Sequence, residues 1–162
     1  MLRTAEMITR FNRLVFEATK WVVFLIAALM LWEVISRYSL NSPTGWAPEL
    51  ATLLFGPFFL LGGPYLLHIG GHVAVDILSA KATGRHAAIL RGVAALLGLL
   101  FGLVLLRYAV PLAYQAWQYG ETSYSGWNPI VWPAKAFLPL AALLLALQAL
   151  AEIAFVLRGE DG

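Results

Sequence analysis

Three side chains with metal-binding chemistry lie close together near the middle of the sequence. His68, His72 and Asp76 follow one another at intervals of four residues, so an unbroken helix would place two imidazoles and a carboxylate on one face, as a metal site requires. Gly70 and Gly71 fall between the histidines and favour the end of a helix and a turn instead. We therefore expect a membrane span to end here and the chain to continue as a short interfacial helix, without a bound metal or cofactor.

Three further charges, Glu33, Arg37 and Arg107, interrupt apolar runs. Along a helix, Glu33 lies ~20 Å and Arg37 ~25 Å beyond Lys20. By the same measure, Arg107 lies ~24 Å beyond Arg91. These positions approach the outer headgroups, where arginine side chains snorkel. Glu33 and Arg37 also have the i, i+4 order that favours a local ion pair, so we interpret them as structural rather than as a proton or substrate relay.

The elements that must hold these groups are helices that cross a membrane. Of the 162 residues, 60% are apolar and 12% are charged, and the apolar residues form runs of the ~20 residues that a helix needs to span a bilayer. We predict an all-α integral membrane protein with a single domain, 1–162, and four transmembrane helices. They cover residues 20–38, 48–67, 88–114 and 133–157. There is no cysteine for a thiolate site and no Walker motif, and we expect no enzyme activity.

Lysine and arginine are unevenly distributed over the two sides that these spans define. One side has eight: Arg3, Arg10, Arg13, Lys20, Lys81, Arg85, Arg91 and Arg158. The other side has three: Arg37, Arg107 and Lys135. Because cytosolic loops carry the excess of basic residues, this bias predicts that both termini and the central loop face the cytosol. The basic residues form no stripe interleaved with aromatics, so we expect no nucleic-acid partner.

The residues before the first span have the pattern of an amphipathic helix. Apolar side chains recur at helical spacing from Met7 to Ala18, while charged ones from Arg3 to Lys20 occupy the other face. Such a helix lies on the inner leaflet with its basic residues at anionic lipid, or it extends the first span into the cytosol. We favour the interfacial arrangement.

Small residues one turn apart mark the third and fourth spans. Gly98 and Gly102 lie in the third span, and Ala142 and Ala146 lie in the fourth. Such pairs let helix backbones approach closely and support assembly in lipid, although glycine and alanine are common in any membrane helix. We name these four residues as helix-packing positions and as candidate surfaces for a partner subunit.

Five short motifs follow one another along the chain. They are RY at 37–38, WAPEL at 46–50, LLGG at 60–63, GHVAVDIL at 71–78 and WNPIVWP at 127–133. In this order they resemble the small membrane subunit of tripartite ATP-independent periplasmic (TRAP) transporters, the DctQ-type family. The motif at 71–78 is the most specific. Pro64 departs from the family pattern, in which small residues such as alanine are more usual after Gly63.

The resemblance implies a scaffold subunit. A larger membrane subunit would carry the substrate and sodium sites, and a soluble periplasmic protein would deliver organic acids or related solutes. The chain would lie in the inner membrane of a bacterium or archaeon, in contact with lipids and with the large subunit. The matching family positions would serve architecture and subunit or lipid contact: Arg37, Trp46, Glu49, His72 and Asp76.

A further expectation is an ion pair at the outer ends of the first two spans. A loop of about ten residues joins Arg37 to Glu49, and an acid near a helix N-terminus is favourable. We expect these two side chains to approach each other, with Glu33 as the competing partner for Arg37.

Two other classes of membrane protein stay open. A self-sufficient four-helix exporter would need a membrane-embedded carboxylate to couple protons to transport, and Glu33 is the candidate. The membrane anchor of a redox enzyme would need two histidines on facing helices to hold haem, whereas His68, His72 and His86 all fall in or beside the central loop. Neither class explains the ordered motifs.

Overall fold

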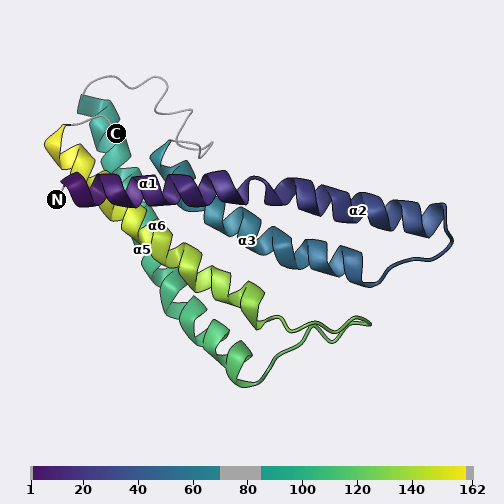
Figure 1. The fold of residues 1–162 in the computed structure, drawn as a ribbon. Coiled ribbons are helices and arrows are strands. Elements are labelled where there is room, and N and C mark those ends of the chain that lie inside the picture. The colour runs from purple at the N-terminus through teal and green to yellow at the C-terminus, as the bar shows by residue number, and fades with distance from the viewer. Residues whose placement is uncertain (1, 70–84, 160–162) are drawn as a thin grey trace.

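The chain forms a bundle of long helices. The computed structural model describes residues 2–69 and 85–159, and five helices lie within them (Figure 1). They are α1 (Leu2–Thr19), α2 (Val22–Tyr38), α3 (Trp46–His68), α5 (Arg85–Gln118) and α6 (Trp132–Arg158).

Four stretches of this bundle are long and apolar enough to cross a membrane. They are Leu2–Tyr38, Trp46–His68, His86–Gln118 and Trp132–Arg158. The prediction of an all-α membrane protein with four spans is therefore confirmed. The expected interfacial helix after the second span lies outside the described residues, and so do His72 and Asp76.

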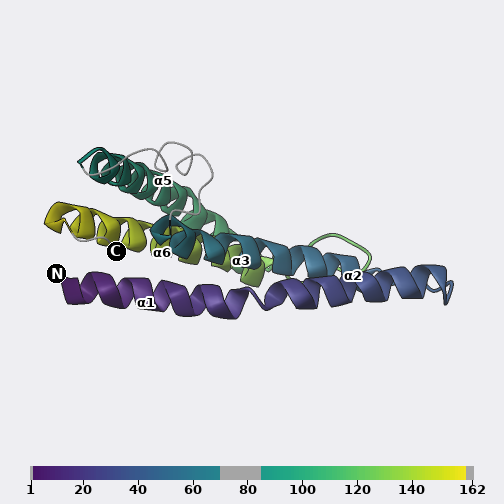
Figure 2. The ribbon, with the colours of Figure 1, turned by 90° about the horizontal axis from the view of Figure 1, so that it is seen from above.

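α1 and α2 form one nearly straight rod (Figure 2). A turn at Lys20 and Trp21 separates the two helices, and hydrogen bonds such as Lys20 N to Phe16 O (3.0 Å) continue the main-chain ladder into it. α1 packs against α3 and α6 and keeps the direction of α2 instead of turning across it. α1 is thus nearly collinear with α2 (Figure 2), and its interfacial position at the inner leaflet stays a prediction.

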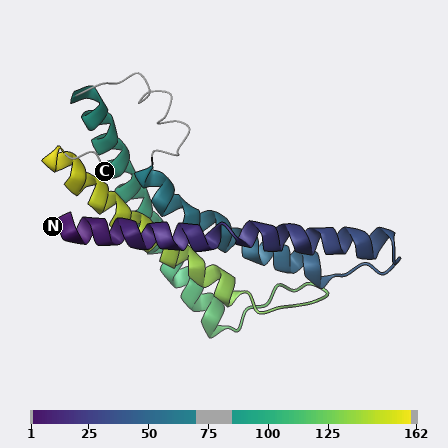
Figure 3. The same cartoon turned by 45° about the horizontal axis from the view of Figure 1, so that its top comes forward.

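α6 is the central helix of the bundle. It packs most extensively against α5 and also contacts α3 and α1, whereas α2 packs mainly against α3. The α2–α3 pair and the α5–α6 pair diverge from each other toward their connecting loops, and the beginning of α1 and the end of α6 lie together at the opposite end (Figures 1 and 3). α6 is therefore well placed to supply side chains that join several helices.

The loop between α5 and α6 is a short hairpin. Val131 N–H donates to Glu121 O (2.9 Å), and Ser123 N–H donates to Pro129 O (3.0 Å). α6 then begins with Pro133 in its first turn, where the missing N–H of proline breaks no helical hydrogen bond. This hairpin projects toward the beginning of α3 (Figure 1).

Candidate functional site: polar clusters, a helix seam and an arginine hollow

A buried amide on α6 organises the end of the bundle at which the termini lie. Gln148 is 0% exposed, and its Oε1 accepts a hydrogen bond from Asn12 Nδ2 (2.8 Å). Its Nε2 donates to Thr9 Oγ1 (3.0 Å) and to Glu152 Oε1 (2.7 Å). Thr9 and Asn12 belong to α1, so one side chain ties α1 to α6.

A histidine from α3 joins the same network. His68 Nδ1 lies 2.7 Å from Glu152 Oε1, the oxygen that also accepts from Gln148. The two atoms are within hydrogen-bond distance, and an ionised carboxylate here would accept from Nδ1–H. The imidazole lies beside the rings of Tyr65 and Phe155. Within residues 2–69 and 85–159 no three metal-binding side chains gather, and His68 is engaged by an acid of its own chain.

Sequence reasoning missed most of this network. It weighed His68 as a metal ligand and passed over Gln148 and Glu152. The available signal was the i, i+4 spacing of an amide and a carboxylate inside the apolar run of α6, because polar groups within a span usually face a partner. Glu152 is also a membrane-embedded acid in addition to Glu33, and any proton-coupled mechanism would have to consider it.

A second polar cluster surrounds Glu33 at the far end of the first span. Glu33 is buried, with 4% of its surface exposed, and accepts hydrogen bonds from the Arg37 guanidinium and the Thr44 hydroxyl. The backbone N–H of Thr44 donates to the same carboxylate at 2.9 Å, and Ser36 Oγ donates to the carbonyl of Ser42 (2.6 Å). These contacts fasten the α2–α3 loop to the end of α2.

The expected pair between Arg37 and Glu49 is wrong. Arg37 pairs with Glu33, the competing partner, because an i, i+4 pair on one helix forms without ordering a loop. Glu49 lies in the first turn of α3 and accepts a hydrogen bond from Ser125 Oγ (2.5 Å). It therefore joins α3 to the α5–α6 hairpin. Trp46, the first residue of α3, is 39% exposed.

A third ion pair, between Lys135 and Glu121, lines a groove between α3 and the α5–α6 loop. Lys135 Nζ donates to both carboxylate oxygens of Glu121 at 2.6 Å. Both residues line a groove of about 470 Å³ between α3, the α5–α6 loop and the beginning of α6, with Gly56 and Pro57 on the α3 side. Because the two charges satisfy each other, this groove offers a ligand little net charge.

The small residues of the third and fourth spans meet inside the chain. A Cβ added to Gly102 would lie 3.1 Å from the backbone N of Ala146 and 3.3 Å from the carbonyl O of Ala142. At Gly98, a Cβ would lie 3.2 Å from Leu67 Cδ2 of α3. The face of α5 at Gly102 is thus covered by α6 and is closed to a partner subunit.

This seam gives a direct stability prediction. Gly102→Ala should lower the stability of the detergent-solubilised chain by about 1–3 kcal/mol, because the new methyl group meets backbone atoms that cannot rotate away. Gly63→Ala is the matched control, since a Cβ at Gly63 meets nothing within 4 Å. Thermal unfolding followed by circular dichroism would compare them. Equal melting temperatures for the two variants would contradict the close α5–α6 approach.

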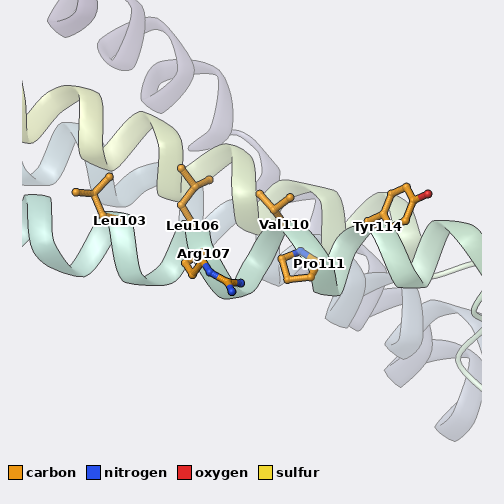
Figure 4. A pocket seen from close by; sticks show the side chains of 6 residues that line it. All are labelled: Leu103, Leu106, Arg107, Val110, Pro111 and Tyr114. Carbon is orange, nitrogen blue, oxygen red and sulfur yellow. The ribbon is translucent and has the colours of Figure 1, made fainter.

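One side of α5 carries a shallow hollow of about 500 Å³ (Figure 4). Its lining is apolar except for one guanidinium and one phenol: Leu103, Leu106, Arg107, Val110, Pro111 and Tyr114. Arg107 is exposed and forms no ion pair or hydrogen bond with the described side chains. It therefore differs from Arg37 and Lys135, which both have acids of this chain as partners.

Comparison with known proteins identifies the family of this bundle. The sequence model described as "Tripartite ATP-independent periplasmic transporters, DctQ component" matches residues 26–159. This match covers more than half of the chain and runs from within α2 to the end of α6. α1 lies before its first residue.

A curated relative agrees with this match over a shorter segment. The sialic acid TRAP transporter small permease protein SiaQ of Vibrio cholerae serotype O1 is 34% identical over 56 residues, which are 35% of this chain and 32% of the relative. The matched segment thus spans about a third of the curated relative. Four membrane-crossing helices and the match over residues 26–159 lead to one conclusion: the chain belongs to the DctQ family of tripartite ATP-independent periplasmic transporters, and it is a transporter component rather than an enzyme.

Proposed function

We propose that the chain is the small membrane subunit of a sodium-coupled, binding-protein-dependent transporter for organic acids or related solutes. The family match over residues 26–159 carries this proposal, since it extends through all four spans. A similar protein is named as part of a sialic acid transporter, and sialic acid is an organic acid. The partners would be a large membrane subunit with the substrate and sodium sites and a soluble binding protein in the periplasm.

Within that complex the chain would act as a scaffold. A static support needs helices held in fixed relation, and the polar contacts join separate elements at both ends of the bundle. Gln148 connects α6 to α1, and Glu49 connects α3 to the α5–α6 hairpin. The two hollows are open at the surface of the bundle, as expected when the transport site belongs to the large subunit.

The orientation that we propose has both termini in the cytosol of a bacterium or archaeon, across its inner membrane. It is supported by the eight-to-three distribution of lysine and arginine over the two sides. The His68–Glu152 network would then lie in the cytosolic half and the Glu33 cluster at the periplasmic end. A reporter fused after Gly162 that reads out the periplasm would contradict this orientation.

One observation favours a second candidate, a self-sufficient proton-coupled transporter. His68 and Glu152 are 15% and 14% exposed and form an acid–base pair inside the bundle, and such pairs serve as proton relays in membranes. The same carboxylate oxygen is also held by Gln148, as in a structural network. The family match supports the first candidate, because it identifies a component of a transporter with several subunits.

Solute uptake into proteoliposomes separates these candidates. With a sodium gradient and a loaded binding protein, vesicles that contain both membrane subunits should accumulate solute, whereas vesicles with this chain alone should not. Glu152→Gln should leave uptake by the complex close to the wild-type rate, because the amide oxygen can still accept from His68. Proton-driven uptake by the chain alone that Glu152→Gln abolishes would overturn the scaffold role.

A further inference from the structure

The charge of Arg107, unpaired among residues 2–69 and 85–159, marks a surface that no described side chain covers. The other described acids in α2–α6 and their loops already have partners: Glu33, Glu49, Glu121 and Glu152. Arg107 has none among the described residues. Gly98 lies nine residues earlier, about two and a half helical turns, and contacts α3 and α6, so Arg107 faces the opposite direction.

The depth of Arg107 makes this isolation costly. Arg107 lies ~24 Å beyond Arg91 and ~15 Å before Trp117 along the helix. Tryptophan marks the membrane interface, and the hydrocarbon core is ~30 Å thick. α5 continues to Gln118, so Arg107 lies about three helical turns before the helix ends. Charged side chains at such a depth usually pair with another polar group.

The backbone beside Arg107 adds a second polar group to the same place. Pro111 lies inside α5 and has no N–H, so the carbonyl of Arg107 receives no helical hydrogen bond from position 111. Arg107 and Pro111 both line the hollow (Figure 4). The hollow therefore combines the Arg107 guanidinium with an apolar rim of Leu103, Val110 and Tyr114, and the Arg107 carbonyl lacks its helical hydrogen bond.

We propose that this hollow is the docking surface for the large membrane subunit and that an acidic side chain on one of its membrane helices pairs with Arg107. The inference rests on the function proposed above. An apolar rim suits a helix of another membrane protein, and a carboxylate matches the planar guanidinium in charge and geometry. Association in lipid depends on such close packing and polar contact, since apolar surfaces gain little there by meeting each other.

The charge also discriminates between occupants of the hollow. A second copy of this chain in a two-fold dimer would place the same patch on both subunits, and the two Arg107 guanidinium groups would face each other with like charge. A lipid phosphate lies at headgroup level, at least ~15 Å from the middle of the hydrocarbon core, and leaves the apolar rim to the acyl chains. An acidic side chain on a membrane helix can reach Arg107 at its depth in the bilayer and carries the opposite charge.

Co-purification of the two membrane subunits tests the proposal. With a tag on this chain and both subunits co-expressed, Arg107→Leu should reduce the recovered large subunit by about tenfold, as expected for loss of one strong interhelical polar contact. Arg107→Lys keeps the charge and should retain most of it. Arg158→Leu is the matched control at the exposed end of α6 and should leave recovery unchanged. Arg107→Glu should be rescued when the paired acid of the large subunit is changed to arginine.

A second measurement keeps the test independent of folding defects. The chain contains no cysteine, so Val110→Cys can be cross-linked to single cysteines in the large subunit with Arg107 intact. Phe59→Cys on the exposed face of α3 is the control. Cross-links from position 110 and not from 59 would support the docking surface.

The outcomes separate this inference from the proposed function. Failure of the wild-type chain to recover any large subunit would overturn the proposed function. Normal recovery with Arg107→Leu, together with no cross-link from position 110, would overturn only the docking surface. Loss of bound lipid from the isolated Arg107→Leu chain, without rescue by any charge exchange in the large subunit, would assign Arg107 to a lipid phosphate and overturn the protein partner.

Discussion

Gln148→Leu is expected to detach α1 from the bundle and to lower the stability of the chain by about 2 kcal/mol. The leucine fills a similar space but leaves Asn12 Nδ2 and Thr9 Oγ1 without their partner on α6, and buried polar groups without partners are costly. Asn12 is only 1% exposed, and its Oδ1 already lacks a hydrogen bond within the described part of the chain. Hydrogen exchange should show faster exchange of the α1 amides, and thermal unfolding should show a lower melting temperature.

Two variants control this experiment. Gln115→Leu makes the same change on an exposed face of α5 and should leave α1 protected. The double variant Asn12→Leu/Gln148→Leu removes both ends of the hydrogen bond and should recover much of the lost stability, because two apolar groups in contact leave no unpaired amide. A double variant as unstable as the sum of its singles would show that packing volume, and not polar satisfaction, holds α1.

The membrane spans could be predicted from the sequence because they depend on composition alone. Each predicted span lies within one of the observed stretches, but the helices continue beyond it: the third runs over Arg85–Gln118 instead of 88–114. Helices extend into the interface, where their polar and aromatic residues no longer raise the hydropathy that marks a span.

The contacts between polar side chains could be predicted only where they are local in sequence. The Glu33–Arg37 pair follows from i, i+4 spacing on one helix, whereas the Arg37–Glu49 pair was inferred from loop length and is wrong. The contact of Gln148 with Asn12 joins residues 136 positions apart and depends on how α1 and α6 rotate about their axes. Hydropathy carries little information about the rotation of α6, because this helix is apolar on nearly all sides.

The second large effect is expected at the other end of the first span, where Glu33→Leu should lower the free energy of unfolding by roughly 3 kcal/mol. The carboxylate accepts hydrogen bonds from Arg37 and twice from Thr44, and bonds to a charged acceptor are stronger than neutral ones. Arg37 is half exposed and can turn to headgroups or water, so most of the loss falls on the α2–α3 loop. Limited proteolysis between residues 39 and 45 should become faster together with a lower melting temperature.

Glu49→Leu is the matched comparison, because it removes the same charge from the beginning of α3 and loses one hydrogen bond, to Ser125. That contact is exposed, so we expect a cost of about 1 kcal/mol or less and an unchanged rate of cleavage between residues 39 and 45. Equal losses of stability in the two variants, with faster cleavage of the loop in both, would restore Glu49 as the partner of Arg37. A large effect confined to Glu33 means that this buried acid alone fixes the α2–α3 loop to the end of α2. Glu49 then anchors the α5–α6 hairpin to α3, and the two connecting loops are held by separate contacts.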